Sequence, residues 1–136
     1  MTSTETPQYP QLPIGAEGTF EKEIPVEWTL VAYDPNLPGV LSTPHMISMM
    51  EIAAAMAVKP HLPEGYLTVG TRIEVDHLKA VTAGKLVVAT AKLVAQHGRF
   101  LTFDVQARTG DVILGHGQVK RAFILPKPFL SKAEAR

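Results

Sequence analysis

The sequence predicts an α+β fold in which an antiparallel β-sheet wraps around one long central helix. A run of good helix formers occupies residues 43–58, and apolar or small side chains would lie on nearly every side of that helix. A helix of this kind must be buried, and one sheet folded around it buries it economically. Extended segments separated by short turns follow the helix, at residues 67–78, 84–97, 99–108 and 111–124.

Length and composition fit one domain. The chain has 136 residues, 46% hydrophobic and 19% charged, which is enough apolar surface for a single core. Basic and acidic residues number 13 each, so charge gives no reason to expect a nucleic-acid or membrane partner. Cysteine is absent, which excludes disulfides and thiolate nucleophiles. With neither a signal-peptide pattern nor a long apolar span, we expect a cytoplasmic protein.

Both ends of the chain are expected to lie outside the domain. Residues 1–18 are rich in Thr, Pro, Gln and Gly, which is typical of a loose arm. In residues 126–136, Pro126 and Pro128 prevent a strand from continuing, so we expect a tail there. A single domain is therefore placed at residues 19–125.

The segments before the helix are expected to be a strand and a loop. Apolar side chains alternate over residues 19–32, which predicts an extended segment, and Pro25 indicates an edge or a bend. The DPNLPG run of residues 34–39 predicts a loop. Thr43 then fits the helix N-cap, and Pro44 fits the first helical position because its missing N–H costs nothing there.

Glu51 is the most informative candidate site residue. It is the only charged side chain between His45 and Val58, in a helix predicted to be buried. A buried carboxylate without a partner is costly, so such a residue is usually paired or used in chemistry. The alternative is that Glu51 lies on a narrow exposed stripe with Ser48 and Lys59.

His77 is the second candidate. The period of two in its strand places His77 on the apolar face with Ile73 and Val75, and that face should meet the helix. The alternative is a core histidine satisfied by backbone groups. Beside a buried Glu51, a catalytic role and a core role for His77 both stay open.

Thr43 has two candidate roles. As N-cap, its hydroxyl would accept a backbone N–H. A helix N-terminus also presents free N–H groups and the positive end of the helix dipole, which suit a developing oxyanion. Ser42 is a neighbouring hydroxyl that could serve instead.

Several common sites are missing from the sequence. It contains no nucleophile elbow, P-loop or dinucleotide fingerprint, and its five histidines show no metal-ligand spacing. No metal or redox cofactor is therefore expected.

Three motifs occur in order: STPHMISMME at residues 42–51, TVGTRIEVDH at 68–77 and KRAFI at 120–124. Over residues 16–125 the chain resembles the fluoroacetyl-CoA thioesterase-like group of hotdog proteins. The resemblance implies a hotdog fold and hydrolysis of an acyl-CoA thioester, with CoA entering as part of the substrate. It further implies a homodimer, or a dimer of such dimers, with each active site built from both subunits.

By position, the resemblance implies catalytic roles for Thr43, Glu51 and His77. It also implies that Gly70 lines the thioester site and that Arg121 serves binding. We add Ser42, the hydroxyl next to Thr43, as a further candidate for binding substrate.

Two positions depart from the family pattern. Val119 stands where the family often has a histidine, and the loop YDPNLPGVL of residues 33–41 lacks the phenylalanines that form a lid in the fluoroacetyl-specific member. We therefore expect short- or medium-chain acyl groups as substrates, without a preference for fluoroacetyl.

Two other functions are compatible with the same residues. A hotdog dehydratase or hydratase acting on acyl-CoA or acyl carrier protein also uses a histidine and a carboxylate. A non-catalytic acyl-CoA-binding module would bind without turnover. Release of free CoA thiol indicates hydrolysis, whereas a change in enoyl absorbance indicates hydration.

Overall fold

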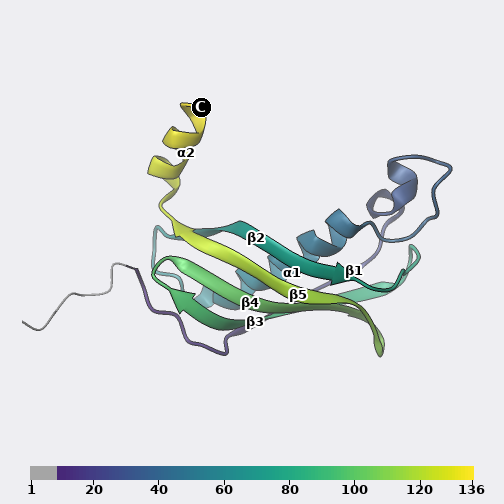
Figure 1. Ribbon diagram of the computed structural model, residues 1–136, viewed down its shortest axis with the longest axis horizontal. Coiled ribbons are helices and arrows are strands. Elements are labelled where there is room, and N and C mark those ends of the chain that lie inside the picture. Colours follow the sequence, from purple (N-terminus) through teal and green to yellow (C-terminus); the bar gives the residue numbers. More distant parts are fainter. Residues whose placement is uncertain (1–8) are drawn as a thin grey trace, which may run out of the picture.

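A computed structural model describes residues 9–136, which form one five-stranded antiparallel sheet and two α-helices (Figure 1). The strand order across the sheet is β1-β3-β4-β5-β2, so β1 and β2 are its edges. Three short 3₁₀ turns complete the described elements: η1 (Val26–Trp28), η2 (Leu30–Ala32) and η3 (Lys59–His61). The strands and helices are β1 (Glu17–Glu23), α1 (Thr43–Val58), β2 (Leu67–His77), β3 (Leu86–His97), β4 (Phe100–Thr109), β5 (Val112–Ile124) and α2 (Pro126–Glu134).

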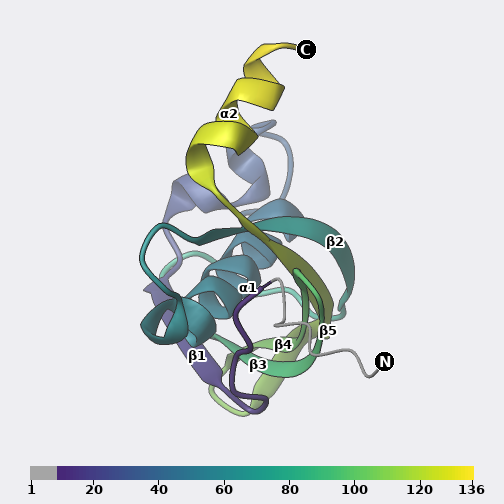
Figure 2. The ribbon, with the colours of Figure 1, turned by 90° about the vertical axis from the view of Figure 1, so that its left-hand side faces the viewer.

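The sheet curls around α1, as the sequence predicts, and the helix lies in its concave side (Figure 2). Residues of α1 that point into the curve, among them Met46, Met49 and Met50, are fully buried. They pack with β4 side chains such as Leu101 and Phe103. The predicted hotdog fold is thereby confirmed, and its four strands after the helix lie within two residues of their expected bounds.

Strand β1 runs directly against α1 because Gly18 lacks a side chain. A Cβ on Gly18 would overlap the carbonyl oxygen of Ala53 and the amide nitrogen of Ala57, and would lie 2.9 Å from the Cα of Ala57. The small residues on this side of α1 therefore allow backbone to approach backbone.

The segment before the helix differs from the prediction. The extended run expected at residues 19–32 ends at Glu23, and η1 and η2 follow. The cause is Pro25, which has no N–H to continue the ladder after Ile24 donates to the Lys85 carbonyl at 2.9 Å.

The C-terminal segment is also more ordered than expected. The prolines that end β5 begin α2 instead of a loose tail, because proline is well tolerated in the first turn of a helix. The sheet and α2 join at Leu125, and the helix stands away from the sheet (Figures 1 and 2). None of the described helices is long and apolar enough to cross a membrane.

The predicted N-cap is off by one residue. Ser42, not Thr43, is the N-cap of α1: its hydroxyl accepts the His45 N–H at 3.3 Å, and its carbonyl accepts the Met46 N–H at 3.0 Å. Ser42 is fully buried, and its Oγ also lies 2.6 Å from Nδ1 of His45. Because Ser42 takes the capping role, the hydroxyl of Thr43 is left for another partner.

Candidate active site

Glu51 lies in the middle of α1 and is paired. Its side chain is 31% exposed, and its Oε1 accepts a hydrogen bond from Nη1 of Arg121 on β5 at 3.2 Å. Burial lowers the pKa of the Arg121 guanidinium, while the charge of Glu51 and this hydrogen bond act in the opposite direction. An arginine keeps its charge at neutral pH even so, and the carboxylate therefore has a permanent cationic partner.

Arg121 is itself held by Thr68 on β2. Its Nε donates to the Thr68 hydroxyl at 3.1 Å, and its Nη2 donates to the Thr68 carbonyl at 2.9 Å. Thr68 was not predicted as a site residue. The signal was available, since Thr68 and Gly70 share one face of the strand by the period of two.

Gly70 lies against the Glu51 carboxylate. A Cβ at this position would overlap Oε1 of Glu51, so any other residue would displace the carboxylate from its present position. The pairing of β2 with β5 shifts register between Gly70 and Arg72, which places the irregular part of the strand beside the helix carboxylate. Glu51, Gly70 and Arg121, to which the family resemblance gave separate roles, therefore lie in one group.

Thr43 and His77 form a second group. Oγ1 of Thr43 and Nδ1 of His77 are 2.7 Å apart and share a hydrogen bond between the start of α1 and the end of β2. Nε2 of His77 is buried and has no hydrogen-bond partner among residues 9–136. The imidazole thus has one nitrogen hydrogen-bonded to the hydroxyl and the other buried without a partner in the described part of the chain.

The helix N-terminus next to this pair offers one free amide. Pro44 has no N–H, and the N–H groups of His45 and Met46 are taken by Ser42. The Thr43 N–H has no acceptor within the described part of the chain. An oxyanion at this end of α1 would therefore meet the amide and the hydroxyl of Thr43.

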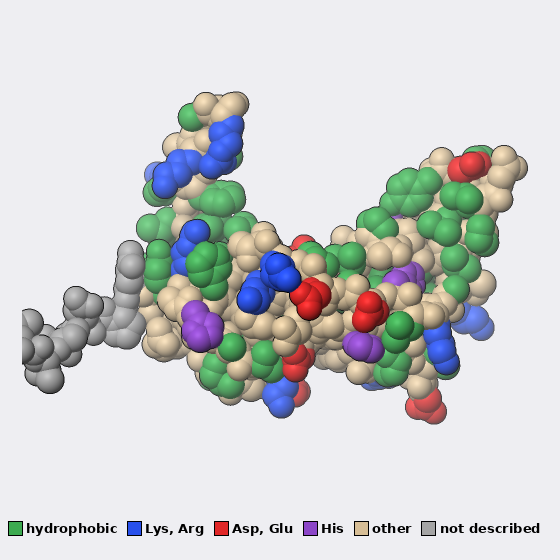
Figure 3. Space-filling view, in the orientation of Figure 1, with side chains coloured by type: hydrophobic (Ala, Val, Ile, Leu, Met, Phe, Trp, Pro, Cys, Tyr) green, Lys and Arg blue, Asp and Glu red, His purple; other side chains and the backbone are tan. Residues whose placement is uncertain are grey.

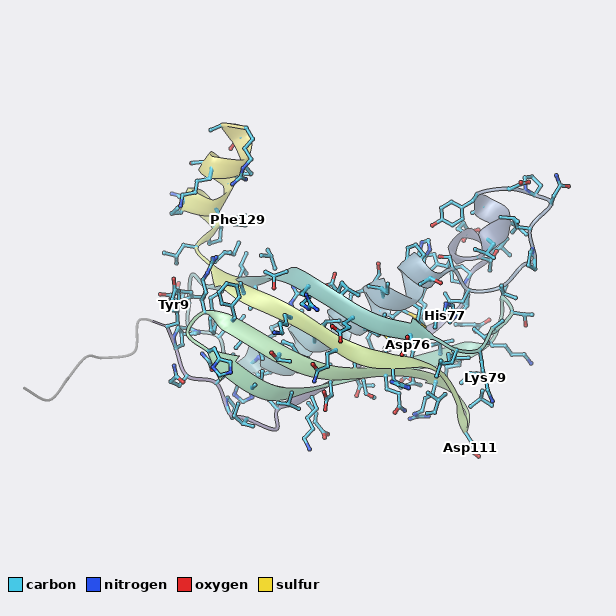
Figure 4. All side chains as sticks on the ribbon, viewed as in Figure 1. Tyr9, Asp76, His77, Lys79, Asp111 and Phe129 are labelled. Carbon is cyan, nitrogen blue, oxygen red and sulfur yellow. The ribbon has the colours of Figure 1, made fainter. Side chains whose placement is uncertain are left out.

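The two groups are separated within one chain. Thr43 and Glu51 are eight residues apart on a single helix, which corresponds to about 12 Å along its axis. Figure 4 shows His77 toward the end of the sheet away from Tyr9 and Phe129. The Thr43–His77 pair and Glu51 therefore do not meet within one chain, although the sequence placed all three in one candidate site. The family resemblance implied a site built from two subunits.

The curled sheet, the central helix and its paired carboxylate define a hotdog protein of the thioesterase type, and solved structures agree. The fluoroacetyl-CoA thioesterase FlK superposes with a TM-score of 0.87 at 30% identity, covering 93% of this chain and 98% of that chain. A hypothetical protein of Thermus thermophilus, a thioesterase superfamily member, has a TM-score of 0.79 at 25% identity over 93% and 98% of the two chains.

The family is defined by sequence as well. Residues 26–127 match the model of the fluoroacetyl-CoA-specific thioesterase family, FlK, and the chain belongs to this family. The fluoroacetyl-CoA thioesterase of Streptantibioticus cattleyicolor is 35% identical over 101 residues, which are 74% of this chain and 73% of the relative.

Proposed function

We propose that the protein is an acyl-CoA thioesterase that releases free CoA and a short- or medium-chain acid. The observation that carries the proposal is the Thr43–His77 hydrogen bond at the N-terminus of the same helix that carries Glu51. Family membership supports the reaction class, and a threonine-to-serine variant of FlK has been solved in complex with acetyl-CoA.

In the proposed reaction, Glu51 accepts a proton from a water molecule as that water attacks the thioester carbon. Arg121 orients the carboxylate, and Gly70 leaves room for that carboxylate beside β2. The tetrahedral oxyanion is stabilised by the N–H and hydroxyl of Thr43 at the positive end of the α1 dipole.

His77 handles the departing thiolate. When the C–S bond breaks, the sulfur leaves with the electron pair and takes a proton from the imidazole. The Thr43 hydroxyl fixes Nδ1, which leaves Nε2 as the nitrogen that exchanges this proton. The products are the free acid and CoA thiol. Glu51 then gives its proton to solvent and His77 takes one up from solvent, which restores both groups.

The separation of the two groups leads us to propose a homodimer with shared sites. In the single chain α1 leaves an apolar stripe uncovered, with Ile52 at 39% and Met56 at 44% exposure, and Ile73 on the edge strand β2 is 40% exposed. Such an apolar stripe beside an unpaired strand edge suits a second copy of the chain.

Antiparallel pairing of β2 with β2 of the second copy would bring the two groups together. A two-fold axis between Ile73 and Glu74 sets Gly70 of one copy opposite His77 of the other. The midpoint between Thr43 and Glu51 on α1 is Ile47, which borders the same hollow as Ile73. The axis that joins the strands therefore also brings Thr43 of one copy toward Glu51 of the other.

A screen of acyl-CoA esters for thiol release tests the proposed function. We expect thiol release from several short- and medium-chain esters, at least about a hundredfold slower in Glu51→Gln. A change in enoyl absorbance without thiol release would make the protein a hydratase or dehydratase. Binding without turnover of any ester would make it a non-catalytic module.

A further inference from the structure

A hollow at the end of the sheet has the composition of a nucleotide site. It has a volume of about 530 Å³ and lies between α2, the end of β5 and the start of β2. Figure 4 shows Tyr9 and Phe129 at this end of the molecule, and Figure 3 shows basic side chains on α2 above hydrophobic ones at its base. Side chains around it include Tyr9, Tyr66, Arg99, Phe129, Lys132 and Arg136.

The charged side chains that line this hollow are all cationic. Its lining includes three cationic side chains and no carboxylate side chain. In the described part of the chain, neither Arg99 nor Lys132 forms an ion pair. Hollows on the sheet mix charges instead, with Lys92 beside Asp104 in one and Arg72 beside Glu74 in another. The hollow next to α2 is therefore suited to an anion, and phosphate groups bind such cations well.

Aromatic rings provide the second recognition element. Tyr9 lies parallel to Phe123 with ring centroids 6.2 Å apart, and Tyr66 meets the same ring edge-on at 5.8 Å. Phe129 of α2 remains 44% exposed. Flat apolar rings beside unpaired cations bind a nucleobase by stacking and its phosphates by charge.

The position of Arg99 is fixed by the sheet. Its carbonyl accepts the N–H of Phe123 at 2.9 Å, which ties the β3–β4 turn to the end of β5. Its guanidinium lies 4.8 Å from the centroid of the Phe100 ring. The cation is thus held at the rim of the hollow.

The hollow lies at a suitable distance from the thioester site. Tyr66 precedes Gly70 by four residues on the same extended segment, which corresponds to about 13 Å. The pantetheine arm of CoA, when extended, spans such a distance. A thioester held beside Glu51 would therefore bring the nucleotide end of CoA to this hollow.

We propose that the hollow between α2 and the sheet binds the 3′-phosphorylated adenosine diphosphate end of acyl-CoA, with Arg99 and Lys132 on its phosphates and Tyr66 and Phe129 on its base. The inference rests on the proposed function, because it takes acyl-CoA as the substrate. It gives α2 a role in substrate affinity rather than in the chemical step.

The test compares an acyl-CoA with the corresponding acyl-pantetheine thioester, which lacks the nucleotide. We expect Arg99→Gln/Lys132→Gln to raise KM for acyl-CoA about tenfold, less at high salt, because each exposed charge contact contributes a few-fold. Its kcat and its KM for acyl-pantetheine should stay unchanged. Lys127→Gln is the matched control, since Lys127 is an exposed cation of α2 outside the lining of the hollow.

Direct binding of adenosine 3′,5′-bisphosphate by calorimetry separates this inference from the proposed function. Weaker binding to the double variant, with unchanged binding to Lys127→Gln, supports the inference even if no thioester is hydrolysed. The inference is overturned if acyl-CoA is hydrolysed with the same KM by the double variant, or if its KM rises equally for both thioesters. It is also overturned if the bisphosphate binds no better than inorganic phosphate.

Discussion

At the scale of residues, Glu51 is expected to matter for chemistry and little for stability. In Glu51→Gln the amide oxygen can still accept from Arg121, so the fold should persist while the proton acceptor is lost. We predict a fall in kcat of at least about a hundredfold with nearly unchanged thermal unfolding. Glu21→Gln, which changes an exposed carboxylate of β1, is the control. Near-normal turnover by a folded Glu51→Gln protein would remove Glu51 from the mechanism.

Substitutions of the adjacent residues Ser42 and Thr43 should have different effects, one on stability and the other on activity. Ser42 caps α1, so Ser42→Ala should lower the free energy of unfolding by about 1 kcal/mol. The Thr43 hydroxyl forms a hydrogen bond with His77 instead. Thr43→Ala should therefore change the free energy of unfolding by less than about 0.5 kcal/mol, yet lower kcat about tenfold or more. Urea unfolding and steady-state kinetics on both variants check this. The reverse pattern would show that Thr43 is the functional cap.

At the scale of elements, the packing of β1 on α1 depends on one missing methyl group. Gly18→Ala would force its Cβ into the backbone of Ala53 and Ala57, which cannot move like a flexible side chain. We predict a loss of about 1–3 kcal/mol in the free energy of unfolding, measured in urea. Gly39→Ala is the control, because its Cβ would meet only Val31 at 4.0 Å. Equal stability of the two variants would contradict the described packing.

The loop of residues 33–40 leads into α1 and is proposed to cover the acyl end of the site. The base of the loop is fixed by a hydrogen bond from the Leu30 N–H to the Val40 carbonyl at 3.0 Å. Pro35 and Pro38 limit the conformational freedom of its backbone. It has no phenylalanine with which to surround a fluorine. We predict similar kcat/KM for fluoroacetyl-CoA and acetyl-CoA, within about tenfold. A preference for fluoroacetyl beyond about a thousandfold would contradict this role of the loop.

At the scale of the whole molecule, the hydrophobic pattern was enough to predict the curled sheet and the buried helix. Periodicity records which side of an element is buried, and that is a local property of the sequence. It placed His77 on the helix side of the sheet, where Nε2 is buried. It also placed Glu51 inward, but that side chain is 31% exposed, and the motif resemblance added Gly70 and Arg121, which lie at Glu51.

The hydrophobic pattern could not predict which residue caps α1 or whether the C-terminal segment forms a helix. Ser42 and Thr43 are both good capping residues, and only the position of His77 shows which hydroxyl is needed elsewhere. Pro126 permits either a loose tail or the first turn of a helix, and α2 formed. The distance between Thr43 and Glu51 follows from the helix rise alone. Whether the two residues serve one site depends on the proposed second copy of the chain.

The central claim is that each active site joins Thr43 and His77 of one copy to Glu51 of the other. The most direct measurement is the activity of a heterodimer, isolated with two different tags, of one His77→Ala chain and one Glu51→Gln chain. Both parent homodimers should be nearly inactive. We expect the heterodimer to recover about half of the wild-type kcat per dimer, because one of its two sites has every residue intact. A heterodimer no more active than its parents, or a protein that is monomeric when active, would contradict a site shared between two copies.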